Sequence, residues 1–231
     1  LQKIRISAEI RAGAKVDIVA HCTFPNAVDV QHLMDADIVV AEGAEYSYFE
    51  RHVHGAEGGV RVIPKTRVTV HDAGRFKTEF ELVKGRVGFM DIDIEAVCHD
   101  RAVMDMTARI SGRGDDEVRI REAGRLIGEN SVGVLTSHIA LRDRAKARIE
   151  NELTADAAFA RGHVDCKEIV QDQAIAAAIP IVEVRNPKAH VTHEASIGSV
   201  DSKQLETLMS RGLSEDDATE LIIGGLLSPS Y

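Results

Sequence analysis

The sequence predicts a mainly β protein, a β-helix (β-solenoid) that ends in a short two-helix segment. The first observation is an alternation of apolar and polar residues, which is typical of strands with one buried face. The second is that these alternating runs recur at roughly fifteen residues or twice that spacing. The third is a low aromatic content of 4%, with five prolines in 231 residues, which suits coils that must stack closely.

The alternation is clearest in four segments, in which residues of one parity are mostly apolar or β-branched and the residues between them are largely charged or polar. These segments are Phe76–Leu82, Met90–Ala96, Ala102–Ile110 and Ala145–Ile149. Each predicts a strand that buries one face. Almost no helical period occurs before residue 200.

New alternating runs open after turn-like polar segments. They open at Ala44, Gly74, Ala102, Val132, Ala145, Ala158, Ala174 and Ala189. This spacing predicts repeats of two strands, one in each of two facing sheets, that stack into a solenoid core domain over residues 1–200. A sandwich or barrel is the alternative, because evenly spaced strands also occur in those folds.

The last thirty residues change to a helical pattern, which predicts a C-terminal segment over residues 201–231. Gly212 is expected to end the first helix as a C-cap, and Ser214, followed by acidic residues, to begin the second. The apolar faces would comprise Leu205, Leu208 and Met209 in the first helix and Ala218, Leu221, Ile222 and Leu226 in the second. Such helices would either cap the open core or present a docking surface.

Composition narrows the functional classes. With 28 Lys and Arg against 37 Asp and Glu, the net charge is −9, which argues against a protein that binds duplex nucleic acid. The longest apolar stretch, 174–182, is far shorter than the roughly 20 residues of a membrane-spanning helix. The first residues also lack the apolar core of a signal peptide. We therefore expect neither a nucleic-acid nor a membrane partner.

The three cysteines, Cys22, Cys98 and Cys166, are widely spaced, and none lies in a C-x-x-C motif. An odd number of cysteines in an acidic chain without a signal sequence is not typical of a disulfide framework. We therefore expect a reducing, cytoplasmic location, and we interpret Cys98 as a core residue.

Two weaker motifs contain polar residues that could bind a metal. His52 and His54 would point to the same face of a strand, so a metal site shared by both, in a β-solenoid metalloenzyme, is one hypothesis. Two exposed strand histidines are the expected alternative. The acidic run Asp115–Glu117 lacks the ligand spacing of a calcium loop, and we interpret it as a solvated turn.

The richest stretch is 162–200. Cys166 precedes His193 and Glu194 by about two solenoid strands, so stacked coils would bring a thiol, an imidazole and a carboxylate near one another. A thiolate with imidazole suits iron, zinc or copper. A buried core cysteine with a structural histidine is an equal alternative on these residues alone.

These residues resemble the C-terminal signature of the SufB/SufD family of iron–sulfur cluster assembly proteins. The resemblance is carried by the strand His190–Ala195, the helix residues Asp201, Gln204 and Leu205, the turn Arg211–Leu213 and the acidic helix start after Ser214. It extends to Gly162–Cys166 and to His21–Pro25, which is similar to the family's Gly-Cys-Thr-Ala-Pro. Counted back from Pro180, the match of Cys166 to the family's cysteine requires a one-residue gap.

The resemblance implies a parallel β-helix that acts as a scaffold for a transient iron–sulfur cluster rather than as an enzyme. It implies that Cys166 lies at the cluster-building site, with His193 and Glu194 as neighbouring ligands at a subunit interface. It implies that Cys22 accepts sulfur at the start of an internal path.

The same resemblance implies several partners. A SufC-type ABC ATPase would bind the terminal helices, and a sulfur donor and iron–sulfur acceptor proteins would act with the scaffold. A homodimer would replace the SufB–SufD pair. A SufD-like subunit that builds no cluster is the alternative, although Cys166 favours the SufB-like role, because SufD-type members can lack that thiol.

Overall fold

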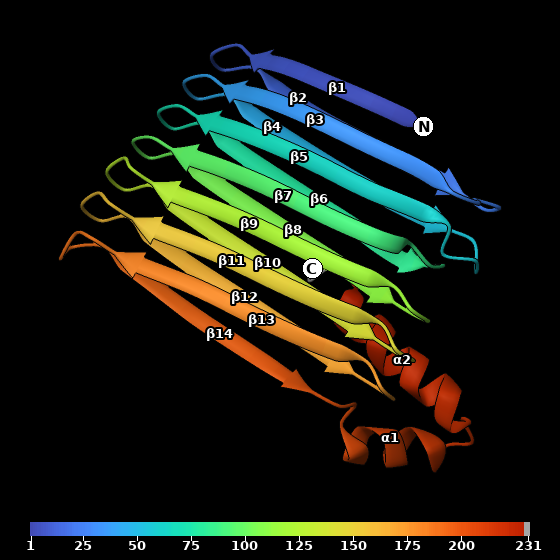
Figure 1. Ribbon diagram of the computed structural model, residues 1–231. Helices are drawn as coiled ribbons and strands as arrows, with labels where there is room; N and C mark the ends of the chain where they lie inside the picture. Colours follow the sequence, from blue (N-terminus) through green and yellow to red (C-terminus); the bar gives the residue numbers. More distant parts are fainter. Residues whose placement is uncertain (229–231) are drawn as a thin grey trace.

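The protein is a parallel β-solenoid of two facing seven-stranded sheets with two helices at its C-terminal end, as a computed structural model describes for residues 1–228 (Figure 1). Sheet A contains β1 (Gln2–Ile10), β3 (Val30–Val40), β5 (Val60–Val70), β7 (Gly88–Cys98), β9 (Glu117–Leu126), β11 (Lys146–Ala155) and β13 (Ile175–Val184). Sheet B contains β2 (Lys15–Phe24), β4 (Glu45–His54), β6 (Arg75–Lys84), β8 (Val103–Gly112), β10 (Val132–Leu141), β12 (Arg161–Val170) and β14 (His190–Gly198).

Each coil of the solenoid places one strand in each sheet, and the next coil stacks directly on it. In sheet A, Gln2 lies opposite His32, and in sheet B, Val132 lies opposite Arg161. All of these pairings are parallel, so side chains of paired residues form rows that run along the solenoid. The repeat predicted from the sequence is confirmed, and the sandwich or barrel alternative is wrong.

The core fills the space between the two sheets. Its residues come from the alternating runs. Phe76, Phe80 and Leu82 in β6 are nearly fully buried, and so are the inward-facing residues of β7 and β8. Cys98 is completely buried in the same core, which confirms its interpretation as a packing residue.

One residue of the acidic run Asp115–Glu117 departs from the expected solvated turn: Asp115 is exposed in a turn, as expected, whereas Asp116 is not. The Asp116 carboxylate is fully buried and accepts hydrogen bonds from the backbone N–H groups of Gly88 and Arg113, both at 3.0 Å. The Arg86 guanidinium lies 3.3 Å from the same carboxylate. Asp116 therefore ties neighbouring coils together, which a single-sequence pattern does not reveal because Arg86 and Gly88 come from the preceding coil.

The C-terminal helices are α1 (Ser202–Met209) and α2 (Glu215–Leu227). Ser214 is the N-cap of α2 and accepts from the Asp217 backbone N–H at 3.1 Å, as the sequence predicts. The first helix ends earlier than expected, with Ser210 rather than Gly212 as its C-cap. Neither helix is long and apolar enough to cross a membrane within the described residues.

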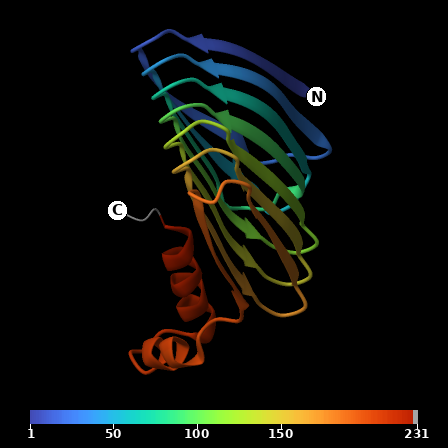
Figure 2. The ribbon, with the colours of Figure 1, turned by 90° about the vertical axis from the view of Figure 1, so that its left-hand side faces the viewer.

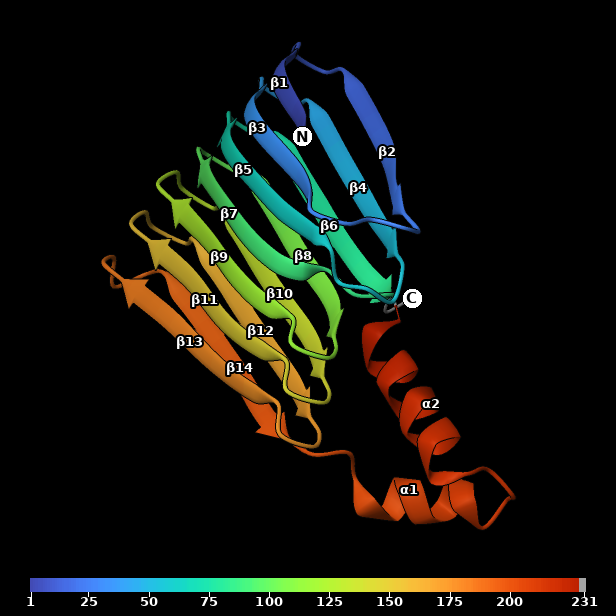
Figure 3. The same ribbon diagram turned by 45° about the vertical axis from the view of Figure 1, so that its right-hand side comes forward.

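Helix α2 lies against the outer face of sheet B (Figures 2 and 3), where Ile223 and Leu227 pack on Ala140 of β10. The predicted apolar face is only partly correct, because Leu221 is 56% exposed whereas Ala218, Thr219, Ile223 and Leu227 are buried. Every residue of α1 is at least partly exposed, so its predicted apolar face covers no core.

Ion pairs fasten α2 to the turn that follows β8 and to the turn that follows β10. Arg113 and Arg142 both bind the Glu220 carboxylate, and Arg142 also contacts Asp216 at 3.2 Å. The imidazole Nδ1 of His138 lies 3.2 Å from the Leu226 carbonyl oxygen and donates to it. The helix is thus held by both apolar contacts and charges.

Candidate functional site

The Cys166 thiol lies inside the solenoid, one coil before its C-terminal end. Cys166 is on β12, has no exposed surface, and is paired with Ser137 of β10 on one side and Ala195 of β14 on the other. Because paired residues of parallel strands share a face, this row points into the core. Only the last coil covers the thiol at the end of the core.

The structure brings His193 to the face of Cys166 and Glu194 to the opposite face. His193 is paired with the buried Val164, so it belongs to the inward rows of sheet B, whereas Glu194 is paired with Asp165 in an outward row. The Glu194 carboxylate lies 4.0 Å from Lys167 Nζ on that outer side. Both His193 and Glu194 are exposed on the edge strand β14.

The one-residue gap in the resemblance decides on which face of sheet B the matched side chain lies. Without the gap, the family's cysteine would match Asp165. Asp165 is paired with Glu194 and contacts His138 at 3.3 Å and Lys167 at 3.1 Å. The two neighbours Asp165 and Cys166 therefore present their side chains on opposite faces of sheet B. A single chain gathers Cys166 and His193 on one face and Asp165 and Glu194 on the other.

Several buried polar side chains lie around Cys166, and the sequence analysis did not identify them. Asn151 of β11 donates to the Ser137 hydroxyl at 2.9 Å across the core. Burial raises the pKa of Glu122 to about 8, and burial together with the charge of Asp165 raises the pKa of Glu168 to about 7. Within residues 1–228, Glu122 Oε2 and both carboxyl oxygens of Glu168 have no hydrogen-bond partner.

This environment keeps the Cys166 thiol protonated in a single chain. Burial raises its pKa to about 12, with further contributions from the charges of Glu168, Glu122 and Asp165. A thiol of this kind is a poor nucleophile by itself. A bound cation reverses that state, because a coordinating thiol loses its proton.

The last coil, which covers Cys166, is itself open to solvent. Within the described part of the chain, strands β13 and β14 each have a neighbour on one side only. Apolar side chains on the inward rows of this coil are exposed, namely Val182 at 38%, Val184 at 46% and Ile197 at 51%. Unpaired strand edges beside exposed apolar side chains are typical of a surface that pairs with another chain.

A second polar cluster lies at the N-terminal end of the core. It consists of Cys22 on β2, His32 on β3, and Glu50 and His52 on β4, whose potential metal-ligating atoms all lie within 4.8 Å of one another. Cys22 Sγ is 3.6 Å from Glu50 Oε1 and 3.8 Å from His32 Nε2. Glu50 Oε1 is 2.8 Å from His52 Nε2.

His52 and His54 are not the exposed pair that the sequence analysis expected. His52 is completely buried and His54 is 5% exposed. The two rings are hydrogen-bonded to each other at 3.0 Å, and His54 Nδ1 donates to the Arg86 carbonyl oxygen at 3.1 Å. Phe24 and Phe80 pack against these rings, which explains how two imidazoles are accommodated inside the core.

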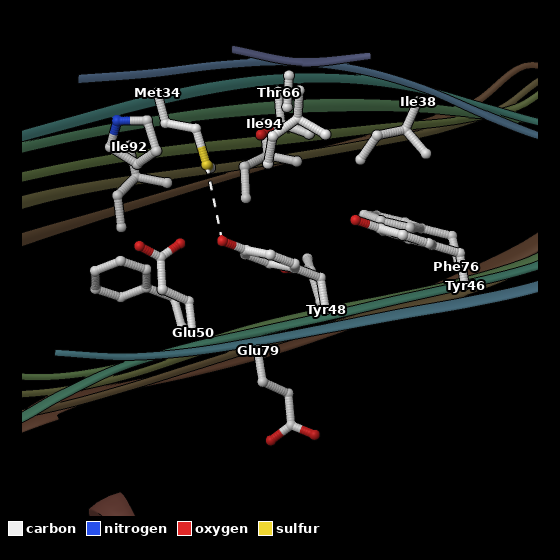
Figure 4. Close-up of a pocket in the computed structure, with 15 residues that line it drawn as sticks. Met34, Ile38, Tyr46, Tyr48, Glu50, Thr66, Phe76, Glu79, Ile92 and Ile94 are labelled. Carbon is white, nitrogen blue, oxygen red and sulfur yellow. Dashed lines mark hydrogen bonds between the residues drawn. The ribbon is translucent and has the colours of Figure 1, made fainter. Parts of the chain in front are cut away.

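The carboxylate of Glu50 is the charged centre of this cluster, and Figure 4 shows it projecting from sheet B into the space between the sheets, beside Tyr48. Burial by itself would raise the pKa of Glu50, but contacts with His32 and His52 outweigh it and lower the pKa to about 2. The Cys22 thiol has its pKa raised to about 12 by burial and by the Glu50 charge. Burial and the neighbouring His52 lower the pKa of His54 to about 4.

The two clusters are connected by rows of stacked side chains. Glu50, Phe80, Ala108, Ser137 and Cys166 form one inward row of sheet B. At about 4.8 Å per strand spacing, Glu50 and Cys166 are roughly 19 Å apart. Apolar Phe80 and Ala108 separate them, so the internal path that the resemblance implies would run past these side chains.

Comparisons with known proteins identify the family. The family model described as "SUF system FeS cluster assembly, SufBD core domain" matches residues 2–226. An iron–sulfur cluster assembly SufBD family protein of Methanocaldococcus jannaschii is 38% identical over 226 residues, which cover 98% of this chain and 72% of the relative. One from Pyrococcus horikoshii is 37% identical, with 98% of this chain and 69% of the relative covered.

A shorter match links the chain to SufB itself. The iron–sulfur cluster assembly protein SufB of Bacillus subtilis is 38% identical over 71 residues, 30% of this chain and 15% of the relative. Together with the solenoid and its terminal helices, the match over residues 2–226 shows that this chain belongs to the SufBD family of iron–sulfur cluster assembly proteins.

Proposed function

We propose that this chain is a scaffold, rather than an enzyme, on which a nascent iron–sulfur cluster is assembled at Cys166. The observation that carries the proposal is the position of this thiol, one coil inside an open solenoid end, in a chain whose family assembles iron–sulfur clusters. Thiolates are the common protein ligands of such clusters. His193 shares the inward face, so it is the second proposed ligand.

A homodimer through the last coil would complete this site. Paired end to end, two chains would cover the exposed Val182 and Ile197 and satisfy the free edges of β13 and β14. The Glu194 carboxylate, on the opposite face from Cys166 within one chain, would then be the ligand offered to the partner's site. An incomplete site in each chain also fits a cluster that must be released to acceptor proteins.

The C-terminal helices are the proposed docking surface for a SufC-type ABC ATPase. Leu221 of α2 is 56% exposed and Met209 of α1 is 41% exposed, although both are large apolar residues. A groove between the helices is lined by Asp201, Lys203, Gln204, Thr207, Leu208 and Ile222. Because α2 is fastened to the turns after β8 and β10 by Arg113 and Arg142, force on the helix would reach β10, the strand that pairs with the Cys166 strand β12.

The remaining parts of the proposal follow from the family. A sulfur donor would supply persulfide sulfur, for which Cys22 is the proposed acceptor, and all three cysteines are free thiols, as a reducing cytoplasm would maintain. The SufD-like alternative is not favoured, because the chain retains the Cys166 thiol. The alternative of a metalloenzyme built on His52 and His54 is not favoured either, because His54 is hydrogen-bonded to His52 and to the Arg86 carbonyl.

Anaerobic incubation with iron and sulfide tests the central part of the proposal. We expect the wild-type chain to acquire the visible absorption of an iron–sulfur cluster together with bound iron and acid-labile sulfide. A wild-type chain that binds the ATPase and acquires no cluster would instead support the structural-subunit role.

A further inference from the structure

The N-terminal cluster has the composition of a metal site, and it lies toward the opposite end of the core from the proposed assembly site at Cys166. One thiol, two imidazoles and one carboxylate converge from three strands in the first two coils. His32, Glu50 and His52 are nearly or completely buried, and Cys22 is half-buried on the terminal strand of sheet B. The cluster is therefore closed on the core side and approachable at the N-terminal end of the solenoid.

Three of the separations between donor atoms match a tetrahedral ion. Ligands at about 2.0–2.3 Å from a zinc-like ion are roughly 3.3–3.8 Å from one another. Glu50 Oε1 is 3.6 Å from Cys22 Sγ and 3.7 Å from His32 Nε2, and Cys22 Sγ is 3.8 Å from His32 Nε2. The 2.8 Å contact between Glu50 and His52 would lengthen by roughly 0.5–1 Å when an ion enters.

Hydrogen bonds outside the cluster orient both imidazoles toward its centre. His32 Nδ1 lies 2.9 Å from Gln2 Oε1, so it donates there and directs Nε2 at Cys22 and Glu50. His54 Nδ1 donates to the Arg86 carbonyl oxygen, so the Nε2 of a neutral His54 accepts from His52 Nδ1. His52 Nε2 faces the Glu50 carboxylate at 2.8 Å and donates to it. An entering ion takes the place of that hydrogen, which leaves to solvent, while His54 keeps the ring oriented as outer partners of metal-bound histidines commonly do.

The charges also balance. A thiolate and a carboxylate together carry −2, which a divalent cation neutralises, and a neutral buried group avoids the cost of an isolated charge in the core. The donor set mixes a soft thiolate with two borderline imidazoles and one hard oxygen, a combination that suits Zn²⁺ or Fe²⁺ rather than Mg²⁺ or Ca²⁺.

We propose that Cys22, His32, Glu50 and His52 form a binding site for one divalent transition-metal ion of the Fe²⁺ or Zn²⁺ class, with His54 and Gln2 as outer partners. Coordination replaces the S–H bond of Cys22 by a sulfur–metal bond and releases the proton to solvent. The site is separate from Cys166, so it stands or falls independently of cluster building there.

Cobalt titration of the metal-free chain tests the site directly, because tetrahedral Co²⁺ with a thiolate ligand gives a sulfur-to-metal charge-transfer absorption. We expect this absorption to saturate at one ion per chain, Zn²⁺ to displace the cobalt, and anaerobic Fe²⁺ to compete with it. Cys22→Ser should abolish the charge-transfer absorption, and Cys166→Ala should retain it. A wild-type chain that binds cobalt without that absorption would overturn the proposal, and so would absorption that survives Cys22→Ser.

A positioning variant separates this site from adventitious metal binding by a free thiol. His54→Gln keeps all four ligands and removes the ring that orients His52, so we expect metal affinity to fall about 10–100-fold. His32→Gln should reduce it further while leaving the Cys22 thiol in place. Circular dichroism checks that each variant is folded. Unchanged affinity in both folded variants would show that Cys22 binds the ion without the cluster.

Discussion

Two buried carboxyl groups in different coils of the core, Glu50 on β4 and Glu122 on β9, have opposite electrostatic settings. Glu50 is surrounded by His32 and His52, which keep it ionised, whereas Glu122 is completely enclosed and has no cationic contact among the residues that the structure describes. Burial disfavours the charged form of a carboxyl group unless nearby groups stabilise the charge. Glu50 is thus equipped to hold a cation, and Glu122 is held as a neutral acid near Cys166.

Glu122 gives the fold a defined pH dependence. Its pKa rises from the ordinary 4.5 of a glutamate side chain to about 8 in the folded chain, so the folded state retains a proton that the unfolded state loses. Retaining this proton stabilises the folded state. That stabilisation is fully present below the unfolded pKa and is lost as the pH rises through about 8. We expect Glu122→Gln to resist urea better than wild type above pH 8, by on the order of 1–3 kcal/mol, and to match wild type near pH 5.

The control for this prediction is Glu183→Gln, at an exposed carboxylate that pairs with Arg185. Urea unfolding of the three proteins across the pH range gives the comparison. Parallel pH profiles for wild type and Glu122→Gln would show that Glu122 is not held protonated.

Single residues of the N-terminal cluster differed in how far the sequence revealed them. Cys22 and His52 were singled out, and Glu50 was detectable in principle, because it lies two residues before His52 and therefore on the same strand face. His32 was not detectable, because it comes from the facing sheet. The burial of His52 and His54 likewise depends on Phe80 and on the Arg86 carbonyl, which belong to the next coil.

At the scale of the element, α2 is the part of the chain whose position the sequence predicts least well. Its start at Ser214 follows from local capping chemistry and was predicted correctly. Its buried face depends on where sheet B lies, so the local pattern favoured Leu221 whereas the sheet covers Ile223 and Leu227. Which face of each strand is buried was predictable, by contrast, because every coil presents the same two environments, core and solvent.

Ile223 is the apolar anchor of α2 on sheet B, and it is 3% exposed. Ile223→Asp places a carboxylate against Ala140, which should cost on the order of 2–4 kcal/mol and release the helix from the sheet. We expect hydrogen exchange of the backbone amides of residues 215–227 to accelerate strongly, while the backbone amides of β10 stay protected. Retained protection of α2 in this variant would show that the Arg113 and Arg142 ion pairs suffice to hold it.

Leu221 lies on the other side of the same helix and tests the proposed docking surface. Leu221→Asp changes an exposed side chain, so we expect α2 to remain on the sheet and the chain to keep its stability, whereas binding to a SufC-type ATPase should weaken at least tenfold. Isothermal titration with the purified ATPase measures the effect. Binding as tight as that of wild type would remove Leu221 from the proposed surface, and binding to a chain lacking 201–231 would remove the helices altogether.

At the scale of the whole molecule, the two ends of the solenoid are not equivalent. Inward-facing residues of the first coil, such as Ile6 and Ile18, are half-buried, whereas Val182, Val184 and Ile197 of the last coil are exposed. The repeat pattern predicts two open ends for any solenoid of this kind. Which end is more exposed depends on side-chain packing, which the alternation alone does not specify.

The exposed C-terminal end predicts where the proposed homodimer forms. Ile197→Asp introduces a charge on the inward row of β14, so we expect it to convert the dimer to a monomer without unfolding the chain. Val19→Asp, at a residue 67% exposed near the N-terminal end, should leave the dimer intact. Sedimentation velocity distinguishes the two states. A dimer that is lost with Val19→Asp and kept with Ile197→Asp would place the interface at the other end.

The most direct test of the scaffold role is anaerobic iron and sulfide reconstitution of four proteins: wild type, Cys166→Ala, Cys98→Ala and Cys22→Ala. Iron, acid-labile sulfide and visible absorption are measured after gel filtration. We expect a cluster in wild type, in Cys98→Ala and, because free sulfide bypasses any sulfur acceptor, in Cys22→Ala, and its loss in Cys166→Ala. A cluster that forms equally well in folded Cys166→Ala would contradict the assignment of Cys166 as the assembly site.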